Sequence, residues 1–308
     1  MATVNTAWDH VSSNIFKTWL IMFGFSVFVV AVIYLFARAW GYDSGGALGL
    51  TGMALIFTGV LNFGSYFFSD KIVLGISGAK PVSVENNRQI YHMVENLGIA
   101  AGLPTPKIYI IEDSAPNAFA TGRDPKHAAI AFTTGILDKL NRQELEAVTA
   151  HELSHVGNRD TLVMTVVSVL VGTIALLADW YMRSMWFGGR DSDSDNKGNA
   201  IFMILGIVAA ILAPIIATMI QLAVSRRREF LADASGSLLT RNPEALATAL
   251  LKISGDKEPL EVANRGTAHL YIVNPLKGQD ALNAFAKLFS THPPVQERVK
   301  ALREMSGL

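Results

Sequence analysis

The chain is 308 residues long and carries 26 Lys and Arg against 26 Asp and Glu, so its formal net charge is zero. Hydrophobic residues make up 50% of the sequence and charged residues 17%, whereas soluble domains carry roughly 25% charged residues. The low charge predicts that lipid surrounds part of the chain. Proteins that rely on phosphate contacts are basic, so the balanced charge argues against a nucleic-acid partner. Cysteine is absent, which excludes disulfides and thiolate ligands and leaves His, Asp and Glu for any metal site.

Four apolar segments divide the chain, and a helix of about 20 apolar residues crosses the ~30 Å hydrocarbon core of a bilayer. They are residues 18–37, 47–68, 161–178 and 200–224. The first segment has an alternative interpretation, because Ala37-Arg38-Ala39 resembles a signal-peptide cleavage site. Its apolar stretch exceeds the ~7–15 residues of a signal peptide, and Asp9 weakens a basic start, so a retained membrane helix is favoured.

Four spans place both termini on the same side of the membrane as the polar region between the second and third spans. Arg226, Arg227 and Arg228 directly follow the fourth span, and such basic residues mark the cytoplasmic side. We therefore expect an N-terminal segment with two spans, the first part of a cytoplasmic domain, a membrane hairpin and the second part of that domain, at residues 1–70, 71–160, 161–224 and 225–308.

The loop of the hairpin, at 180–199, carries alternating Asp residues near its centre. This pattern weakly resembles a calcium-binding loop, but it lacks the closing Glu of an EF-hand. A solvated turn is therefore favoured over a cation site.

The polar regions have the patterns of a mixed domain. Alternation predicts a strand at 107–111 and two more at 117–122 and 128–132, around a turn at Arg123-Asp124-Pro125. Helices are predicted to begin at Ser83, at Asn141 with Glu144 as its capping-box partner, after Ser225, at Asn242-Pro243 and near Pro293. We expect an α+β membrane protein with four transmembrane helices and a mainly helical domain that carries a small β-sheet.

The helix predicted from Asn141 carries His151-Glu152-Leu153-Ser154-His155, an H-E-x-x-H motif. Residues four apart share a helix face, so the two imidazoles can bind one metal ion and Glu152 can reach a water on that ion. The alternative is two surface histidines on an ordinary helix. The capping box and the apolar remainder of the helix favour a buried site.

Catalytic zinc takes three protein ligands and keeps a fourth position open. Glu229 and Asp233 are four residues apart, so one carboxylate can bind the metal while the other orients a ligand histidine. The alternative is a charged helix beside the membrane in which Glu229 only balances the preceding arginines, and spacing alone favours neither. The membrane hairpin favours the ligand role, because it returns the chain to the membrane face that carries the H-E-x-x-H helix.

Four motifs follow one another along the chain: N-A-F-A-T-G at 117–122, H-E-L-S-H at 151–155, S-R-R-R-E-F-L-A-D at 225–233 and T-H-P-P at 291–294. With these motifs and four predicted spans, the chain resembles the HtpX-type membrane zinc metalloproteases over nearly its whole length. The related Ste24-type proteases share the motifs but have more membrane helices, so this short chain looks closer to HtpX.

The resemblance implies a zincin-like metalloprotease domain with one Zn²⁺ per chain. It assigns His151, His155 and Glu229 as zinc ligands, Glu152 as general base, and Asp233 as the carboxylate that supports the ligands from outside.

The resemblance also suggests roles for two residues in substrate handling. Asn117 would bind the substrate backbone on an exposed edge strand, and His292 would steady the oxyanion. Taken alone, Asn117 equally suits a turn after Pro116, and His292 better suits a helix start before Pro293.

The implied function is an integral membrane zinc endopeptidase in quality control under stress, with misfolded or damaged membrane proteins as substrates. Zinc activates a water, and Glu152 takes its proton and passes it to the leaving amine. The expected location is the bacterial inner membrane, multi-pass, with the active site and both termini on the cytoplasmic side.

Two other classes of protein compete with this interpretation. A non-catalytic zinc-binding scaffold or assembly factor would have a closed metal site and would be indifferent to Glu152. A transporter is disfavoured because the first, third and fourth apolar segments carry no charge. ATP is not expected as a partner, since the sequence lacks a G-x-x-x-x-G-K-[ST] phosphate loop.

Overall fold

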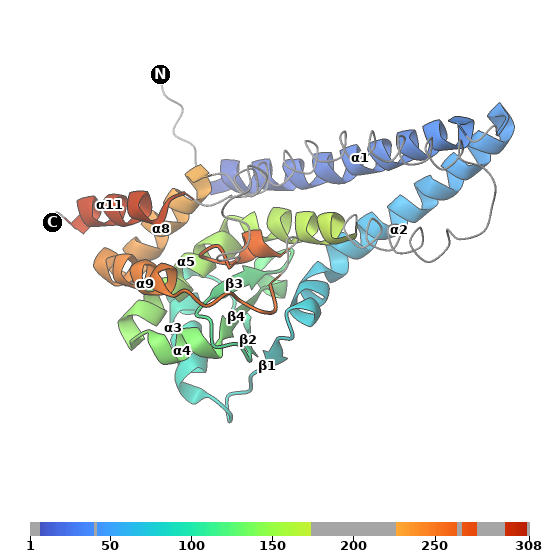
Figure 1. Ribbon diagram of the computed structural model, residues 1–308. Helices are drawn as coiled ribbons and strands as arrows, with labels where there is room; N and C mark the ends of the chain where they lie inside the picture. Colours follow the sequence, from blue (N-terminus) through green and yellow to red (C-terminus); the bar gives the residue numbers. More distant parts are fainter. Residues whose placement is uncertain (1–6, 40–41, 174–225, 264–266, 276–292, 307–308) are drawn as a thin grey trace, which may run out of the picture.

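A computed structural model describes residues 7–39, 42–173, 226–263, 267–275 and 293–306. The fourth predicted span (200–224), the loop at 180–199 and His292 lie outside these residues. Figure 1 shows two long helices that project from a smaller domain built of strands and helices.

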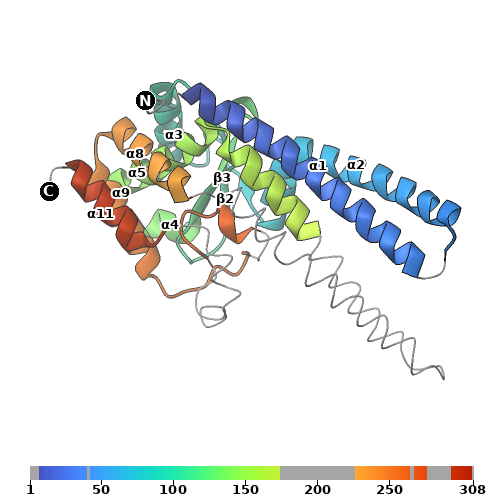
Figure 2. The same ribbon diagram turned by 90° about the horizontal axis from the view of Figure 1, so that it is seen from above.

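The two long helices, α1 (Ala7–Ala39) and α2 (Ser44–Ile76), form an antiparallel hairpin (Figures 1 and 2). Asp43 begins α2 by accepting a hydrogen bond from the Gly46 N–H. Both helices are long and apolar enough to cross a membrane. Large apolar side chains stand exposed along them, among them Phe16, Phe23, Ile56 and Val60. Lipid favours such a surface and water disfavours it, so the structure contains candidates for two of the four predicted spans.

The third predicted span is described only as far as Thr173. Its first part is an apolar helix, Asp160–Thr173, which lies beside α1 in two views (Figures 1 and 2). Leu162, Val166 and Leu170 on this helix are buried. This part of the segment therefore packs against the protein itself.

The domain contains a four-stranded sheet in the order β1-β2-β4-β3. The strands are β1 (Lys80–Pro81), β2 (Lys107–Ile111), β3 (Ala118–Thr121) and β4 (Ala129–Thr133). β2 and β4 are parallel, while β1 and β3 run antiparallel to their neighbours. The predicted turn at Arg123-Asp124-Pro125 lies between β3 and β4, and Gly122 directly before it has φ 124°. A Cβ there would lie 2.4 Å from the His127 carbonyl oxygen, so the turn requires glycine.

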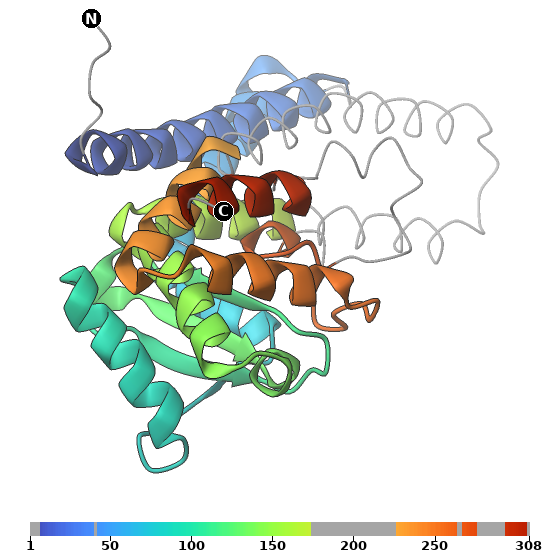
Figure 3. The same cartoon turned by 90° about the vertical axis from the view of Figure 1, so that its left-hand side faces the viewer.

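Helices cover the sheet and enclose the centre of the domain. They are α3 (Arg88–Ala101), α4 (Thr134–Lys139), α5 (Arg142–Gly157), α8 (Arg226–Thr240), α9 (Pro243–Gly255) and α11 (Val295–Ser306), with 3₁₀ turns at Pro125–His127 (η1) and Ala268–Leu270 (η2). α9 and α11 lie side by side (Figure 3).

Most helix starts are those predicted from capping residues. Asn141 and Glu144 form a capping box at α5, and Asn242 caps α9 with Pro243 in its first turn. The expected start at Ser83 is wrong, because Ser83 forms a turn with Asn86 and the helix begins only after Asn87. Asn87 accepts a hydrogen bond from the Ile90 N–H, which satisfies a donor at the helix end.

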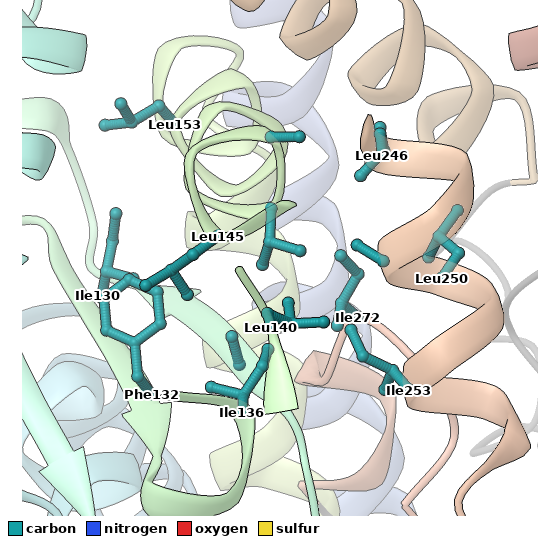
Figure 4. Packing of buried hydrophobic residues seen from close by; sticks show 14 of the residues in the cluster. Ile130, Phe132, Ile136, Leu140, Leu145, Leu153, Leu246, Leu250, Ile253 and Ile272 are labelled. Atoms are coloured by element: carbon teal, nitrogen blue, oxygen red, sulfur yellow. The ribbon is translucent and has the colours of Figure 1, made fainter. Parts of the chain in front are cut away.

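Two apolar clusters hold the domain together. The first joins the sheet to the helices α3, α5 and α9, and Figure 4 shows Ile130 and Phe132 of β4 near Leu145 of α5. The second joins Phe119 of β3 to Ile21 of α1 and to α2 and the Asp160–Thr173 helix. The N-terminal half of α1 and the C-terminal end of α2 are therefore packed on the domain rather than joined to it by a linker.

Candidate metal centre

α5 carries the H-E-x-x-H motif into the centre of the domain. His151, Glu152 and His155 are all buried, as are Leu145 and Val148 earlier in the helix. The helix is enclosed because β3, α3, α8 and α9 all pack against it. The surface-histidine alternative therefore does not describe this structure.

α8 approaches α5 very closely at Gly236. A Cβ on Gly236 would lie 2.8 Å from the His151 backbone nitrogen and 3.0 Å from the Ala150 carbonyl carbon. Real Cβ atoms do not come this near to backbone, so only glycine lets the two helices meet. The contact places Glu229, which lies on the same buried face of α8, opposite the two histidines. Sequence reasoning did not identify Gly236.

Three ligand atoms from His151, His155 and Glu229 converge, all within 4.8 Å of one another. The two Nε2 atoms are 3.2 Å apart. Nε2 of His151 lies 3.8 Å from Oε2 of Glu229, and Nε2 of His155 lies 3.5 Å from Oε1. Ligands about 2.0–2.1 Å from a tetrahedral zinc are about 3.3 Å apart. The donor set and its spacing therefore fit a zinc ion.

The outer nitrogen of each imidazole faces a buried carboxylate. Nδ1 of His151 lies 3.0 Å from Oδ1 of Asp233, and Nδ1 of His155 lies 3.0 Å from Oδ2 of Asp160. In the neutral imidazole, a carboxylate at Nδ1 keeps the proton on that nitrogen and leaves the lone pair of Nε2 for the site where the three ligand atoms meet.

The structure thus places Asp233 where the sequence suggested and adds Asp160, which sequence reasoning missed. Asp160 begins the apolar helix Asp160–Thr173, directly after Arg159, whose φ of 60° turns the chain. A single acid at the start of an apolar segment is a weak signal by itself. The sequence feature that points to Asp160 is its position five residues after His155.

Arg298 of α11 is the second residue that sequence reasoning missed. It is 1% exposed, and its guanidinium donates two hydrogen bonds to Asp233, from Nε at 2.8 Å and from Nη2 at 2.6 Å. Nη1 donates to the carbonyl of Ile272 at 3.0 Å and lies 3.5 Å from Oε2 of Glu229. A buried cation of this kind balances part of the negative charge that Glu152, Glu229 and Asp233 bring into the site.

Burial and charge shift the pKa values of the site residues in different directions. Burial raises the pKa of the Glu152 carboxyl to about 7, and the Glu229 charge adds to the rise. Burial lowers the pKa of His151 despite the neighbouring Asp233. For His155, burial alone would lower the pKa, but the Asp160 hydrogen bond and the Glu229 charge outweigh it and raise the pKa to about 9. Glu152 is therefore the acid whose ionisation is poised near neutral pH.

β3 is an edge strand beside this site, but it is not the exposed edge that was expected. All of Ala118–Thr121 is buried, and the Ala118 carbonyl accepts a hydrogen bond from the Ile272 N–H at 3.0 Å. The side-chain amide of Asn117 donates to the Val273 carbonyl at 2.9 Å. The chain's own Ile272 and Val273 therefore cover this part of the edge, while the Ala120 N–H favours the ionised form of the Glu152 carboxyl and lowers its pKa.

Comparison with known proteins agrees with this geometry. Residues 84–306 match peptidase family M48. A protease HtpX homolog from Thermoanaerobacter pseudethanolicus is 44% identical over 306 residues, which cover 98% of each chain. A second HtpX homolog, from Pyrococcus furiosus, is 48% identical over 270 residues, or 86% of this chain and 90% of that protein.

A solved structure shows a similar fold. Ste24p from S. mikatae has a TM-score of 0.50 and 17% identity to this chain, and the similarity covers 96% of this chain and 66% of the longer Ste24p chain. At 17% identity this similarity shows the fold alone, whereas the family match and the near full-length relatives show the family. The chain therefore belongs to peptidase family M48 and is a membrane metalloprotease of the HtpX type.

Proposed function

We propose that the protein is a zinc endopeptidase with one Zn²⁺ per chain, held by His151, His155 and Glu229. The observation that carries this proposal is the convergence of three buried ligand atoms while a carboxylate faces the outer nitrogen of each histidine. M48 metalloproteases use a metal that is generally zinc. When bound, zinc supplies Lewis acidity, which lowers the pKa of a water and polarises a substrate carbonyl.

Glu152 is the general base of the proposed mechanism. It lies on the same helix between the two histidines and is 2% exposed. Burial raises its pKa to about 7 in the metal-free protein, so this carboxylate accepts a proton more readily than an exposed glutamate does. The proton taken from water would then pass to the leaving amine. Burial also keeps bulk water from competing for the carboxylate.

Asn117 and His292 remain candidates for substrate contacts. The edge of β3 that does not pair with β4 lies next to Glu152, and an extended peptide can bind to a sheet edge by strand addition. A peptide that used the Ala118 carbonyl would have to take the place of Ile272. For His292 the proposed role is support of the oxyanion.

We further propose that the substrates are misfolded or damaged membrane proteins, cut at the cytoplasmic face of a bacterial inner membrane. The packing of α1 and α2 on the domain supports a site close to the bilayer, because residues of both helices share one apolar cluster with β3. The antiparallel hairpin also brings the start of α1 and the end of α2 to the same end of the helix pair, next to the domain, which supports the expected topology.

Metal removal tests the proposal. Full-length protein in detergent, stripped by a chelator, should lose cleavage of an unfolded protein substrate and regain it with one equivalent of zinc. Glu229→Ala should bind zinc weakly and not cleave. If stripped protein still cleaves, or if Glu229→Ala binds zinc as tightly as wild type, the assigned centre is wrong. Zinc binding without any cleavage would favour the scaffold alternative.

A further inference from the structure

A chain of hydrogen bonds joins the first membrane helix to the metal centre. The Nδ2 group of Asn14 in α1 donates to Oδ1 of Asp160 at 2.7 Å and to the Asn158 carbonyl at 2.8 Å. The other oxygen of Asp160 lies 3.0 Å from Nδ1 of His155. Only one carboxylate therefore separates α1 from a proposed zinc ligand.

Asn14 belongs to a buried stripe on a helix that is otherwise widely exposed. Asn14 is 4% exposed, and Thr18, Ile21, Met22 and Phe25 follow it on the same face at helical spacing. Burial of an amide is unfavourable unless its donors are satisfied, and here both N–H groups of the Asn14 amide have an acceptor. The match of two donors to two acceptors fixes the position of α1 against the turn that ends α5.

The geometry also fixes the Asp160 carboxylate. Its Oδ1 is held by Asn14 and lies 3.4 Å from Nη1 of Arg228, so Oδ2 is left to face His155. Without Asn14 the carboxylate would lose a buried donor and a restraint on its rotation. Partners that orient a ligand histidine typically affect metal affinity by about 10–100-fold.

We propose that Asn14 is a positioning residue of the metal centre, so that the first membrane helix completes the site as well as anchoring it. This inference rests on the proposed function, because it takes His155 as a ligand. It predicts that zinc affinity depends, through Asp160, on a side chain of α1, the helix that carries the first predicted membrane segment.

Zinc affinity, measured by competition with a chromophoric chelator on full-length protein in detergent, tests this inference. Asp160→Ala should weaken binding about 10–100-fold. Asn14 is one hydrogen bond further from the zinc ligand than Asp160, so Asn14→Ala should weaken zinc binding by less, about 3–10-fold. Ile21→Ala removes packing from the same face of α1 but no hydrogen bond. It should lower the unfolding temperature while leaving zinc affinity unchanged.

A double-mutant cycle separates positioning from general loosening. If Asn14 acts through Asp160, then Asn14→Ala should have no further effect on zinc affinity in the Asp160→Ala background. Equal losses in both backgrounds, or a loss in Ile21→Ala as large as in Asn14→Ala, would overturn the inference. The visible spectrum of bound Co²⁺ gives a second readout, and it should change in Asn14→Ala if the ligand geometry changes.

Two further variants complete the test. If Asn14→Ala does not accumulate, Asn14→Asp keeps the size of the side chain but places a carboxylate against Asp160, and it should weaken zinc binding more. Unchanged affinity in Asn14→Asp would contradict the inference. His155→Ala tests the proposed function itself: if it keeps full affinity, the ligand assignment fails, whereas loss in His155→Ala with none in Asn14→Ala removes only the role of Asn14.

Discussion

Arg298 donates two hydrogen bonds to Asp233, from Nε to Oδ2 at 2.8 Å and from Nη2 to Oδ1 at 2.6 Å. The same carboxylate faces Nδ1 of His151, so the C-terminal helix α11 holds a group that orients a proposed ligand on α5. The guanidinium favours the ionised form and keeps the pKa of Asp233 below its usual range, although burial alone would raise it.

Arg298→Gln should therefore damage both stability and metal binding. It leaves Asp233 as a buried charge without its partner, and loss of one member of a buried pair costs about 3–5 kcal/mol. We expect a lower unfolding temperature in detergent and weaker zinc binding. Arg303→Gln on the same helix is the control, because Arg303 pairs with Glu244 at the surface. Similar unfolding temperatures for the two variants would contradict the role given to Arg298.

Gly236→Ala should push α8 away from α5. The added methyl group would meet the His151 backbone, and overpacking of this kind costs about 1–3 kcal/mol. Because Glu229 is on α8, zinc affinity should fall together with stability. Gly255→Ala is the matched control, since a Cβ there meets no atom within 4 Å. Wild-type zinc affinity in Gly236→Ala would show that the close approach does not set the ligand geometry.

Zinc binding should tighten as pH rises over a range in which ordinary histidines no longer titrate. The pKa of His155 is raised to about 9, so a proton occupies the ligand at neutral pH and must leave when metal binds. Affinity should rise by up to about tenfold per pH unit between about pH 7 and 8.5. Asp160→Asn removes the charge that stabilises the imidazolium, so its plateau should begin at lower pH. A wild-type plateau already at neutral pH would contradict the raised pKa.

The parts of the site that follow from local sequence were predictable. The H-E-x-x-H spacing and the Asn141 and Glu144 capping box depend on residues within a few positions of one another, and the structure contains both on α5. The four-residue spacing of Glu229 and Asp233 likewise puts both carboxylates on one face of α8, although spacing alone did not show that this face meets α5. These features need only the geometry of one helix.

The parts that depend on contacts between distant elements were not predictable. Arg298 is separated from Asp233 by 65 positions, and Asn14 from Asp160 by 146, so no local pattern connects them. The family resemblance suggested an edge strand at Asn117, but the coverage of the β3 edge by Ile272 depends on a contact with a distant part of the chain. Ser83 does not cap a helix because the residues after it form a turn, and the helix begins only after Asn87, which accepts from the Ile90 N–H.

The central claim is that Glu152 is the general base for a water at a zinc site formed by His151, His155 and Glu229, and Glu152→Gln tests it most directly. Gln has the shape of Glu but cannot accept the proton, so the variant should bind one zinc per chain with near wild-type affinity. Its cleavage of an unfolded protein should fall by about 10²–10⁴-fold, the usual contribution of a general base. Zinc content and cleavage rate, measured on the same preparations, decide the matter. Cleavage at the wild-type rate by zinc-loaded Glu152→Gln would contradict the account.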